Sequence, residues 1–404
     1  MNISQFLKNN YSVVLKTIVA LVIIGYFAVT RPHGTLSVVI FIVLLGVLVF
    51  VHELGHFAMA KLFGIRVDEF GMGFPPRAKK LFHRNGTDYT LNWIPFGGFV
   101  KIYGEDSLEN GTQDPDYKRS MGAKSWWKQV IVLIAGVTMN ILLAWFLFSI
   151  AFMVGAPTAV SGVDNPDQVK NAQLTVLQVL PGSPAEKSGL TAGDKILKLE
   201  TLTTVIESND LTAENFTQAI HNSELNVPIH VQIQKTDKTI SDLLIVPQKG
   251  LIAEYPAIGV SVDRVGMYRE GFFKSIKSGF INTVSVTKQT GVAFYHLITD
   301  AFQGKADTKN LTGPVGLVSV VGDAQKIGAV YVIMLAAMIS INLAVLNLIP
   351  FPALDGGRIV TVIIEAITRR KINANIIGWV NTIGFFLLIA LMIFISIKDV
   401  IKLF

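Results

Sequence analysis

A run of apolar residues at positions 36–63 constrains this chain more than any other feature of its sequence. The run is long enough to cross a bilayer as a helix, and similar runs occur at residues 11–30, 130–154, 329–348 and 376–397. Of the 404 residues, 51% are hydrophobic and only 16% are charged, whereas soluble proteins carry about 25% charged residues. We therefore expect a polytopic α-helical membrane protein with about five transmembrane helices.

Three ionisable side chains lie near the end of the run at 36–63, in the pattern H-E-x-x-H: His52, Glu53 and His56. Residues four apart share one face of a helix, so both imidazoles can bind one metal ion. Glu53 would lie beside that ion without being a ligand, where it can take a proton from a water molecule. A pair of structural histidines is the alternative. Ionisable groups at membrane depth are costly and usually functional, which favours the metal site.

Zinc suits this pattern, because two imidazoles and one carboxylate leave its fourth position open. Cysteine is absent from the sequence, so thiolate ligands are excluded. We expect Asp355 to supply the carboxylate, in the segment Asn347-Leu-Ile-Pro-Phe-Pro-Ala-Leu-Asp355-Gly-Gly. The prolines and glycines break a helix at membrane depth, which is tolerated where the backbone lines a cavity or is buried in protein. The alternative role for Asp355 is to cap a helix at this break.

Asn140 is another polar residue at membrane depth, within the run at 130–154 and shortly after Ala135 and Gly136. Small residues allow a neighbouring helix to approach closely. Asn140 is therefore expected to face protein, and the sequence leaves open whether it serves packing or a site.

Basic residues cluster at residues 64–124 and again at Arg358 and 369–371, and the positive-inside rule places both segments in the cytoplasm as loops. The metal site then lies toward the cytoplasmic side of the membrane. Within the first loop, residues 65–103 alternate as β-strands do. A hairpin there could pair with an extended substrate or be an ordinary cytosolic hairpin. No basic patch with interleaved aromatic residues occurs, so we expect no nucleic-acid partner.

Residues 156–264 would be a soluble insert on the extracytoplasmic side. They contain the motif Pro181-Gly-Ser-Pro-Ala-Glu-Lys-Ser-Gly-Leu190, followed by Gly193-Asp194. This pattern resembles a PDZ domain of the bacterial, circularly permuted kind. The resemblance implies that an extended peptide or substrate segment binds along a sheet edge. A PDZ fold that only blocks access to the membrane site is the alternative.

We expect five regions along the chain. The first is an N-terminal extra transmembrane helix and not a cleaved signal peptide, because no small-x-small cleavage site precedes the turn at 31–34. The regions are residues 1–34 (extra helix), 35–155 (first part of the membrane core), 156–264 (PDZ domain), 265–326 (amphipathic interfacial region) and 327–404 (second part of the core).

The early H-E-L-G-H motif, the inserted PDZ pattern and the late N-x-x-P-x-P-x-L-D-G-G motif together resemble the site-2 protease family of intramembrane zinc metalloproteases. The likeness is greatest to its bacterial, RseP-like members and covers the chain from about residue 36 onward. It implies one zinc ion held by His52, His56 and Asp355. It also implies that Glu53 acts as general base and acid and that Asn347 helps to hold the substrate.

The same resemblance implies a membrane-associated β-hairpin near the active site, at residues 65–103. Two features depart from the family pattern. Members of the sigma-E type carry two tandem PDZ domains where this chain has room for one, and the helix at 11–30 is additional.

The expected function is hydrolysis of peptide bonds in or near transmembrane segments of single-span substrates, at the inner membrane of a bacterium. Such regulated intramembrane proteolysis includes cleavage of anti-sigma factors and of signal-peptide remnants. Expected partners are these substrates, a peptide segment at the PDZ domain and the lipid bilayer. A catalytically silent PDZ scaffold is the alternative, although a structural zinc site has no need of Glu53. A metal transporter would need acidic or histidine residues on successive helices, and the remaining runs supply almost none.

Overall fold

The computed structural model describes residues 34–105, 114–163, 169–180, 182–249, 255–304 and 313–402. The chain divides into two compact units. The first, here called the helical unit, comprises Met1–Ser149, Ile276–Gln325 and Val332–Phe404; the second, the β unit, comprises Ile150–Ser275 and Lys326–Tyr331. The helix expected at residues 11–30 lies outside the described residues.

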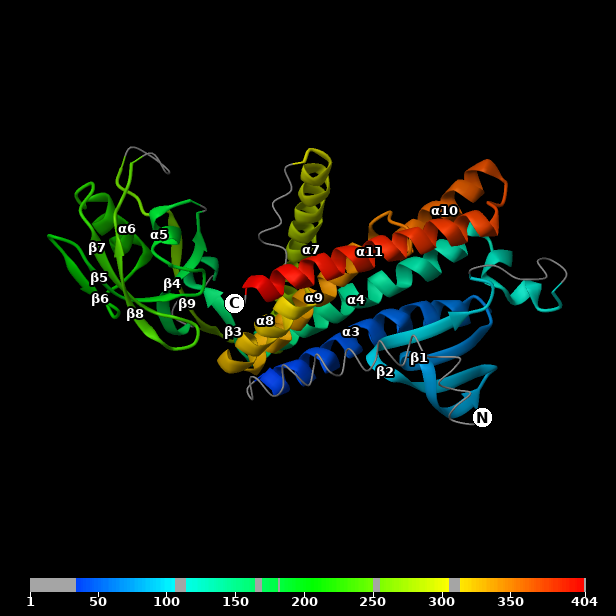
Figure 1. Ribbon diagram of the computed structural model, residues 1–404. Coiled ribbons are helices and arrows are strands. Elements are labelled where there is room, and N and C mark those ends of the chain that lie inside the picture. The colour runs from blue at the N-terminus through cyan, green and yellow to red at the C-terminus, as the bar shows by residue number, and fades with distance from the viewer. Residues whose placement is uncertain are drawn as a thin grey trace. The chain divides into compact units, whose positions relative to one another are not determined.

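Four helices of the described chain are long and apolar enough to cross a membrane (Figure 1). A helix satisfies its own backbone hydrogen bonds, which is what lipid requires of a spanning segment. The four spans agree with four of the five predicted apolar runs. They lie in α3 (Gly34–Leu62), α4 (Trp126–Val154), α9 (Ala329–Leu348) and α11 (Ala374–Lys402).

Helices α3 and α4 pack closely because of two glycines. A Cβ atom on Gly55 would lie 2.4 Å from the carbonyl oxygen of Ala135, and one on Gly136 would lie 2.5 Å from the His56 ring. Helix α9 packs on α3 through small and apolar residues, with Ala336 and Leu48 in one buried cluster. Close backbone approach of this kind stabilises helix pairs in lipid.

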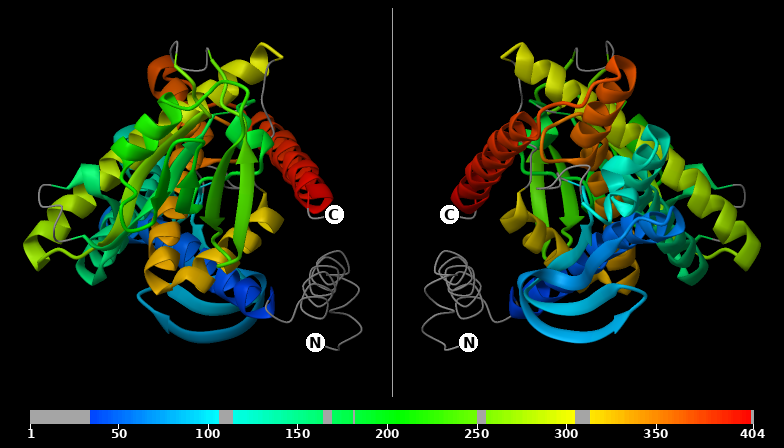
Figure 2. Two further views of the ribbon diagram at one scale, coloured as in Figure 1. Left: turned by 90° about the vertical axis from the view of Figure 1, so that its left-hand side faces the viewer. Right: turned by 90° about the vertical axis from the view of Figure 1, so that its right-hand side faces the viewer.

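Helix α11 lies at the side of the bundle (Figure 2) and is the least buried of the four spans. It is held at two places. Asn381 accepts a hydrogen bond from the backbone N–H of Ala353 at 3.2 Å. Asp399 accepts hydrogen bonds from the N–H groups of Gly313 and Gly316 at 2.8 and 2.9 Å.

Three further helices of the described chain lie after its last strand in the sequence. Helix α7 (Phe272–Phe302) covers the amphipathic segment, and α8 (Pro314–Ile327) follows it. Helix α10 (Asp355–Thr368) contains Arg358, so the segment expected to be a cytoplasmic loop includes a helix that was not predicted. The sequence of α10 is strongly amphipathic, and its Ile359 and Val362 pack on the buried cluster that includes Leu133.

A β-hairpin occupies the segment where strands were expected, as β1 (Val67–Arg84) and β2 (Thr87–Ile102). Its turn is Asn85-Gly86, both with positive φ, which is the preferred chemistry of a tight hairpin turn. The start of β1 pairs with both ends of β2: Phe70 is registered with Val100 and also with Tyr89. The hairpin therefore folds back on itself, and it lies beside α3 (Figures 1 and 2).

The β unit contains one antiparallel sheet with the order β3-β9-β4-β5-β7-β8, and β6 pairs with β5. A buried apolar cluster that includes Phe216 and Ile196 fills its core. Ser183 caps α5, and Thr212 forms a capping box with Asn215 at the start of α6. The elements are β3 (Ala156–Ala159), β4 (Lys170–Val179), α5 (Pro184–Lys187), β5 (Lys195–Glu200), β6 (Val205–Glu207), α6 (Ala213–His221), β7 (Ile229–Gln234), β8 (Ile240–Ile245) and β9 (Val260–Tyr268).

Candidate metal centre

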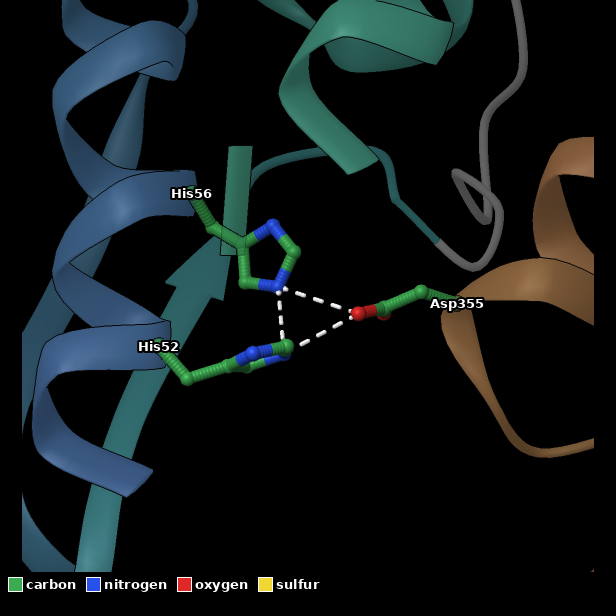
Figure 3. A group of neighbouring side chains, drawn as sticks. All are labelled: His52, His56 and Asp355. Atoms are coloured by element: carbon green, nitrogen blue, oxygen red, sulfur yellow. Dashed lines mark hydrogen bonds and ion pairs between the residues drawn. The ribbon is translucent and has the colours of Figure 1, made fainter. Parts of the chain in front are cut away.

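Two imidazoles on one face of α3 form the first half of the site. His52 and His56 are one helical turn apart, and each is 6% exposed. Their Nε2 atoms lie 3.1 Å apart and point to the same position (Figure 3). The H-E-x-x-H spacing thus produces the convergence that it predicts on a helix.

Asp355 completes the group from the far end of the chain. Its Oδ2 atom lies 3.0 Å from His52 Nε2 and 3.4 Å from His56 Nε2 (Figure 3). Burial raises the pKa of the Asp355 carboxyl, but hydrogen bonds with the two imidazoles outweigh it, so the pKa lies well below its usual range. The carboxylate is therefore ionised, as a metal ligand must be.

Asp355 reaches this position because the chain turns sharply after α9. Ala353 has a φ of +72°, an unusual value for a residue with a side chain, and α10 starts two residues later. A Cβ atom on Gly356 would lie 2.2 Å from the carbonyl oxygen of Ile349. Only glycine allows this approach of the α10 start to the end of α9, and Asp355 is the first residue of α10.

The three side chains fit a zinc ion. One ligand atom from each of His52, His56 and Asp355 lies within 4.8 Å of the other two. Among the described residues, these three side chains are the group that could hold a metal ion. Two nitrogen donors and one oxygen donor are a usual set for zinc when a fourth position is left open for chemistry.

The second ring nitrogens of both histidines face α4. His56 Nδ1 lies 2.8 Å from the carbonyl oxygen of Val132. His52 Nδ1 lies 3.5 Å from the side-chain nitrogen of Asn140, which is fully buried. Helix α4 therefore contacts both rings, and Gly136 lies against their Nε2 atoms without a side chain that would displace them.

Glu53 lies between the histidines in sequence and next to the hairpin in space. A Cβ atom on Gly98 would lie 3.2 Å from Glu53 Cγ and 2.9 Å from the Cα atom of Phe50. The hairpin backbone therefore lies directly against α3 at Glu53. The Glu53 carboxylate also interacts electrostatically with His56 and Asp355.

Asn347 lies in the last turn of α9, and its side-chain nitrogen is 3.5 Å from His52 Nε2. Arg358 is one turn after Asp355 and forms an ion pair with Glu105, just after β2. The hairpin, α9 and α10 thus meet around one position. Every residue singled out from the sequence as a site residue is found here: His52, Glu53, His56, Asn347 and Asp355.

Two contributions to the site escaped sequence reasoning. The contact of Asn140 with His52 was signalled only by a polar residue at membrane depth, a signal that left packing equally open. The close fit of Gly136 against both rings has no local signal beyond its being small, because it depends on two helices far apart in sequence.

Known proteins similar to this chain share most of its length. Residues 40–391 match the profile of a family described as "Peptidase family M50". A protein of Clostridium perfringens named "Putative zinc metalloprotease" is 35% identical over 88% of this chain and 95% of its own length. A protein of Geobacillus kaustophilus named "Zinc metalloprotease RasP" is 28% identical over 91% of this chain and 98% of its own length. The similarity thus extends over both units.

Proposed function

The chain belongs to peptidase family M50 and is a membrane-bound zinc metalloprotease, and we propose that it hydrolyses peptide bonds in or near the transmembrane segments of single-span proteins. One observation carries the proposal. His52, His56 and Asp355 converge beside Glu53. His52, Glu53 and His56 lie within a helix long enough to cross a membrane.

We assign His52, His56 and Asp355 as the zinc ligands. The bound ion supplies Lewis acidity, which polarises the scissile carbonyl group and makes a water molecule more acidic. Glu53 is the general base that takes a proton from this water and then the general acid that delivers it to the leaving amine. Its place beside the ligands, and the absence of any structural need for a carboxylate there, favour an enzyme over a silent scaffold.

A substrate helix must unwind before cleavage, because its hydrogen bonds hide the backbone carbonyl groups. We propose that the unwound segment adds to the sheet edge formed by residues 98–102. Residues 98–102 pair on one side with the start of β1, and no strand among the described residues pairs with their other side. An edge of this kind binds extended peptides through backbone hydrogen bonds. Asn347 would hold the segment next to the ligands, since its amide is already near His52.

The β unit is proposed to be a PDZ domain that binds an extended peptide or substrate segment. Two observations support this proposal. Helix α6 lies against β9, and β9 follows a tight turn at Gly259, which has a φ of +81°. A strand and a helix side by side after such a turn form the type of groove in which PDZ domains add a peptide strand.

The charge pattern supports a proposed orientation in the membrane. The basic residues of the hairpin, Arg358 and the basic residues at 369–371 favour a cytoplasmic location for the metal centre, and the β unit is then proposed to lie outside the cytoplasm. The bacterial relatives favour a cell membrane location. Regulated intramembrane proteolysis, such as cleavage of anti-sigma factors or signal-peptide remnants, is the role proposed for this arrangement.

The test uses the purified full-length protein and a tagged single-span substrate. Cleavage should require zinc, and Glu53→Gln should abolish it while zinc remains bound, because Glu53 is not a ligand. Undiminished cleavage by the Glu53→Gln variant would exclude the mechanism, and loss of zinc from that variant would exclude the ligand assignment.

A further inference from the structure

The two histidines differ in what holds their second ring nitrogen. His56 donates from Nδ1 to the backbone carbonyl of Val132, a group that no substitution removes. His52 instead turns its Nδ1 toward the side chain of Asn140, at 3.5 Å. Val132, Gly136 and Asn140 are spaced four residues apart in α4 and therefore form one stripe that lies along the two rings. Only the contact to His52 depends on a side chain.

The chemistry of a ligand histidine decides the direction of this contact. His52 Nε2 points to Asp355 and His56, so it is the nitrogen that carries the free electron pair toward the ion. A neutral imidazole has one protonated nitrogen, which must then be Nδ1. His52 Nδ1 is thus a hydrogen-bond donor, and it needs an acceptor, because histidine ligands almost always donate from their second nitrogen.

Asn140 has a buried acceptor with no other use. Its side chain is fully buried, and its Oδ1 atom has no hydrogen-bond partner among the described residues. Half a turn of the amide about its last bond exchanges oxygen and nitrogen in nearly the same space. In that orientation the His52 Nδ1–H group meets the amide oxygen, so a donor faces an acceptor. With the nitrogen toward the ring, two donors would face each other.

The backbone around Asn140 is fixed from a third helix. The hydroxyl of Ser340 in α9 donates to the carbonyl oxygen of Asn140 at 2.8 Å, and Ser340 is itself fully buried. The side chain of Asn140 is therefore held against His52 and has little freedom to serve another partner.

We propose that Asn140 is a positioning residue of the metal site. Its amide oxygen accepts a hydrogen bond from His52 Nδ1–H and so fixes the tautomer and the ring plane in which Nε2 faces the ion. This inference rests on the proposed function for the assignment of Nε2 as the ligand atom, and it assigns to this chain a fourth residue that sets zinc affinity without touching zinc.

The experiment compares zinc binding by purified full-length wild type, Asn140→Asp and Asn140→Leu, measured by competition with a chromophoric chelator. The three side chains have nearly the same shape. An ionised aspartate can accept hydrogen bonds but not donate them, and leucine can neither donate nor accept them. We expect Asn140→Leu to weaken zinc binding about 10- to 100-fold, the usual cost of losing such a partner, and Asn140→Asp to stay close to wild type. The visible spectrum of cobalt-substituted protein should change in the leucine variant alone.

Ser149→Ala is the matched control, since Ser149 is another buried polar residue of α4 and, among the described residues, its hydroxyl donates only to the backbone carbonyl of Trp145 in the same helix. Its zinc affinity should equal that of wild type. If the leucine variant is not recovered folded, Asn140→Ala takes its place. Wild-type affinity in the leucine or alanine variant, or equal weakening in the aspartate variant, overturns the inference. A wild-type protein that binds no zinc would instead refute the proposed function itself.

Discussion

Gly98 of β2 lies against Glu53 of α3, so closely that a methyl group on Gly98 would be 3.2 Å from Glu53 Cγ and 2.9 Å from the Cα atom of Phe50. The contact joins the hairpin to the residue proposed as general base. Since the nearest of these atoms belongs to the α3 backbone, the hairpin would have to move if a side chain were added.

Gly98→Ala should therefore lower proteolysis and leave zinc binding intact. A shift of about 1 Å in a substrate-positioning element can reduce a rate about 100-fold. The measurement is kcat for a tagged single-span substrate, together with zinc content. Gly122→Ala is the control, because a methyl group there meets only ordinary contact, 3.6 Å from Gly104. Equal rates for the Gly98 variant and wild type would show that this contact does not position substrate.

Gly136→Ala should weaken zinc binding, which Gly98→Ala should leave intact. The added methyl group would lie 2.5 Å from His56 Nε2 and 2.8 Å from His52 Nε2, so the rings must move. We expect zinc affinity to fall at least about 10-fold, as for other disturbances of ligand orientation. The control is Gly291→Ala in α7, where a methyl group meets nothing within 4 Å. Both replacements raise helix propensity, so a difference between them measures the steric effect alone.

Asn381→Leu should loosen the turn that presents Asp355. The Asn381 side chain is the acceptor for the N–H group of Ala353, whose positive φ makes the turn costly to hold. We expect faster zinc release in a stopped-flow chelator assay, because the third ligand becomes less well ordered. Thr382→Val is the control, since in the part of the chain that the structure describes the Thr382 hydroxyl donates only to the carbonyl of Gly378 within α11. Identical release rates in the two variants would argue against a role for α11 in holding Asp355.

The orientation can be tested with single cysteines, because the chain has none of its own. A membrane-impermeant maleimide applied to intact spheroplasts should label Thr203→Cys, in an exposed position of the β unit. Lys79→Cys, exposed in the hairpin, should be labelled only after the membrane is opened. Labelling of the unmodified protein should be absent in both conditions. The reverse pattern would place the metal centre on the other side of the membrane.

Local patterns predicted the apolar spans and the three side chains that converge, because both are encoded within a few residues. The apolar runs gave α3, α4, α9 and α11, and two short motifs contained the three groups that converge. Helix α10 was missed because Arg358 was interpreted as a loop charge, whereas it forms an ion pair with Glu105 on the side of the helix. The signal that would have identified α10 is its amphipathic pattern.

Contacts between distant segments lie beyond such reasoning. The pairing of Phe70 with both Tyr89 and Val100 depends on how the hairpin folds back, and alternation alone fixes only which residues are strands. In the same way, the sequence shows Asn140 as polar but not which ring it touches. Such contacts are fixed by the packing of α3 against α4, which two glycines permit.

His52 and Asp355, whose side chains converge, are 303 residues apart in the sequence. A ribosome that adds about 5–20 residues per second needs about 15–60 s to cover that distance. Throughout this interval the nascent chain carries both imidazoles and Glu53 but lacks Asp355. If Asp355 is needed for cleavage, as proposed, the nascent chain cannot cut neighbouring membrane proteins until residue 355 has been added.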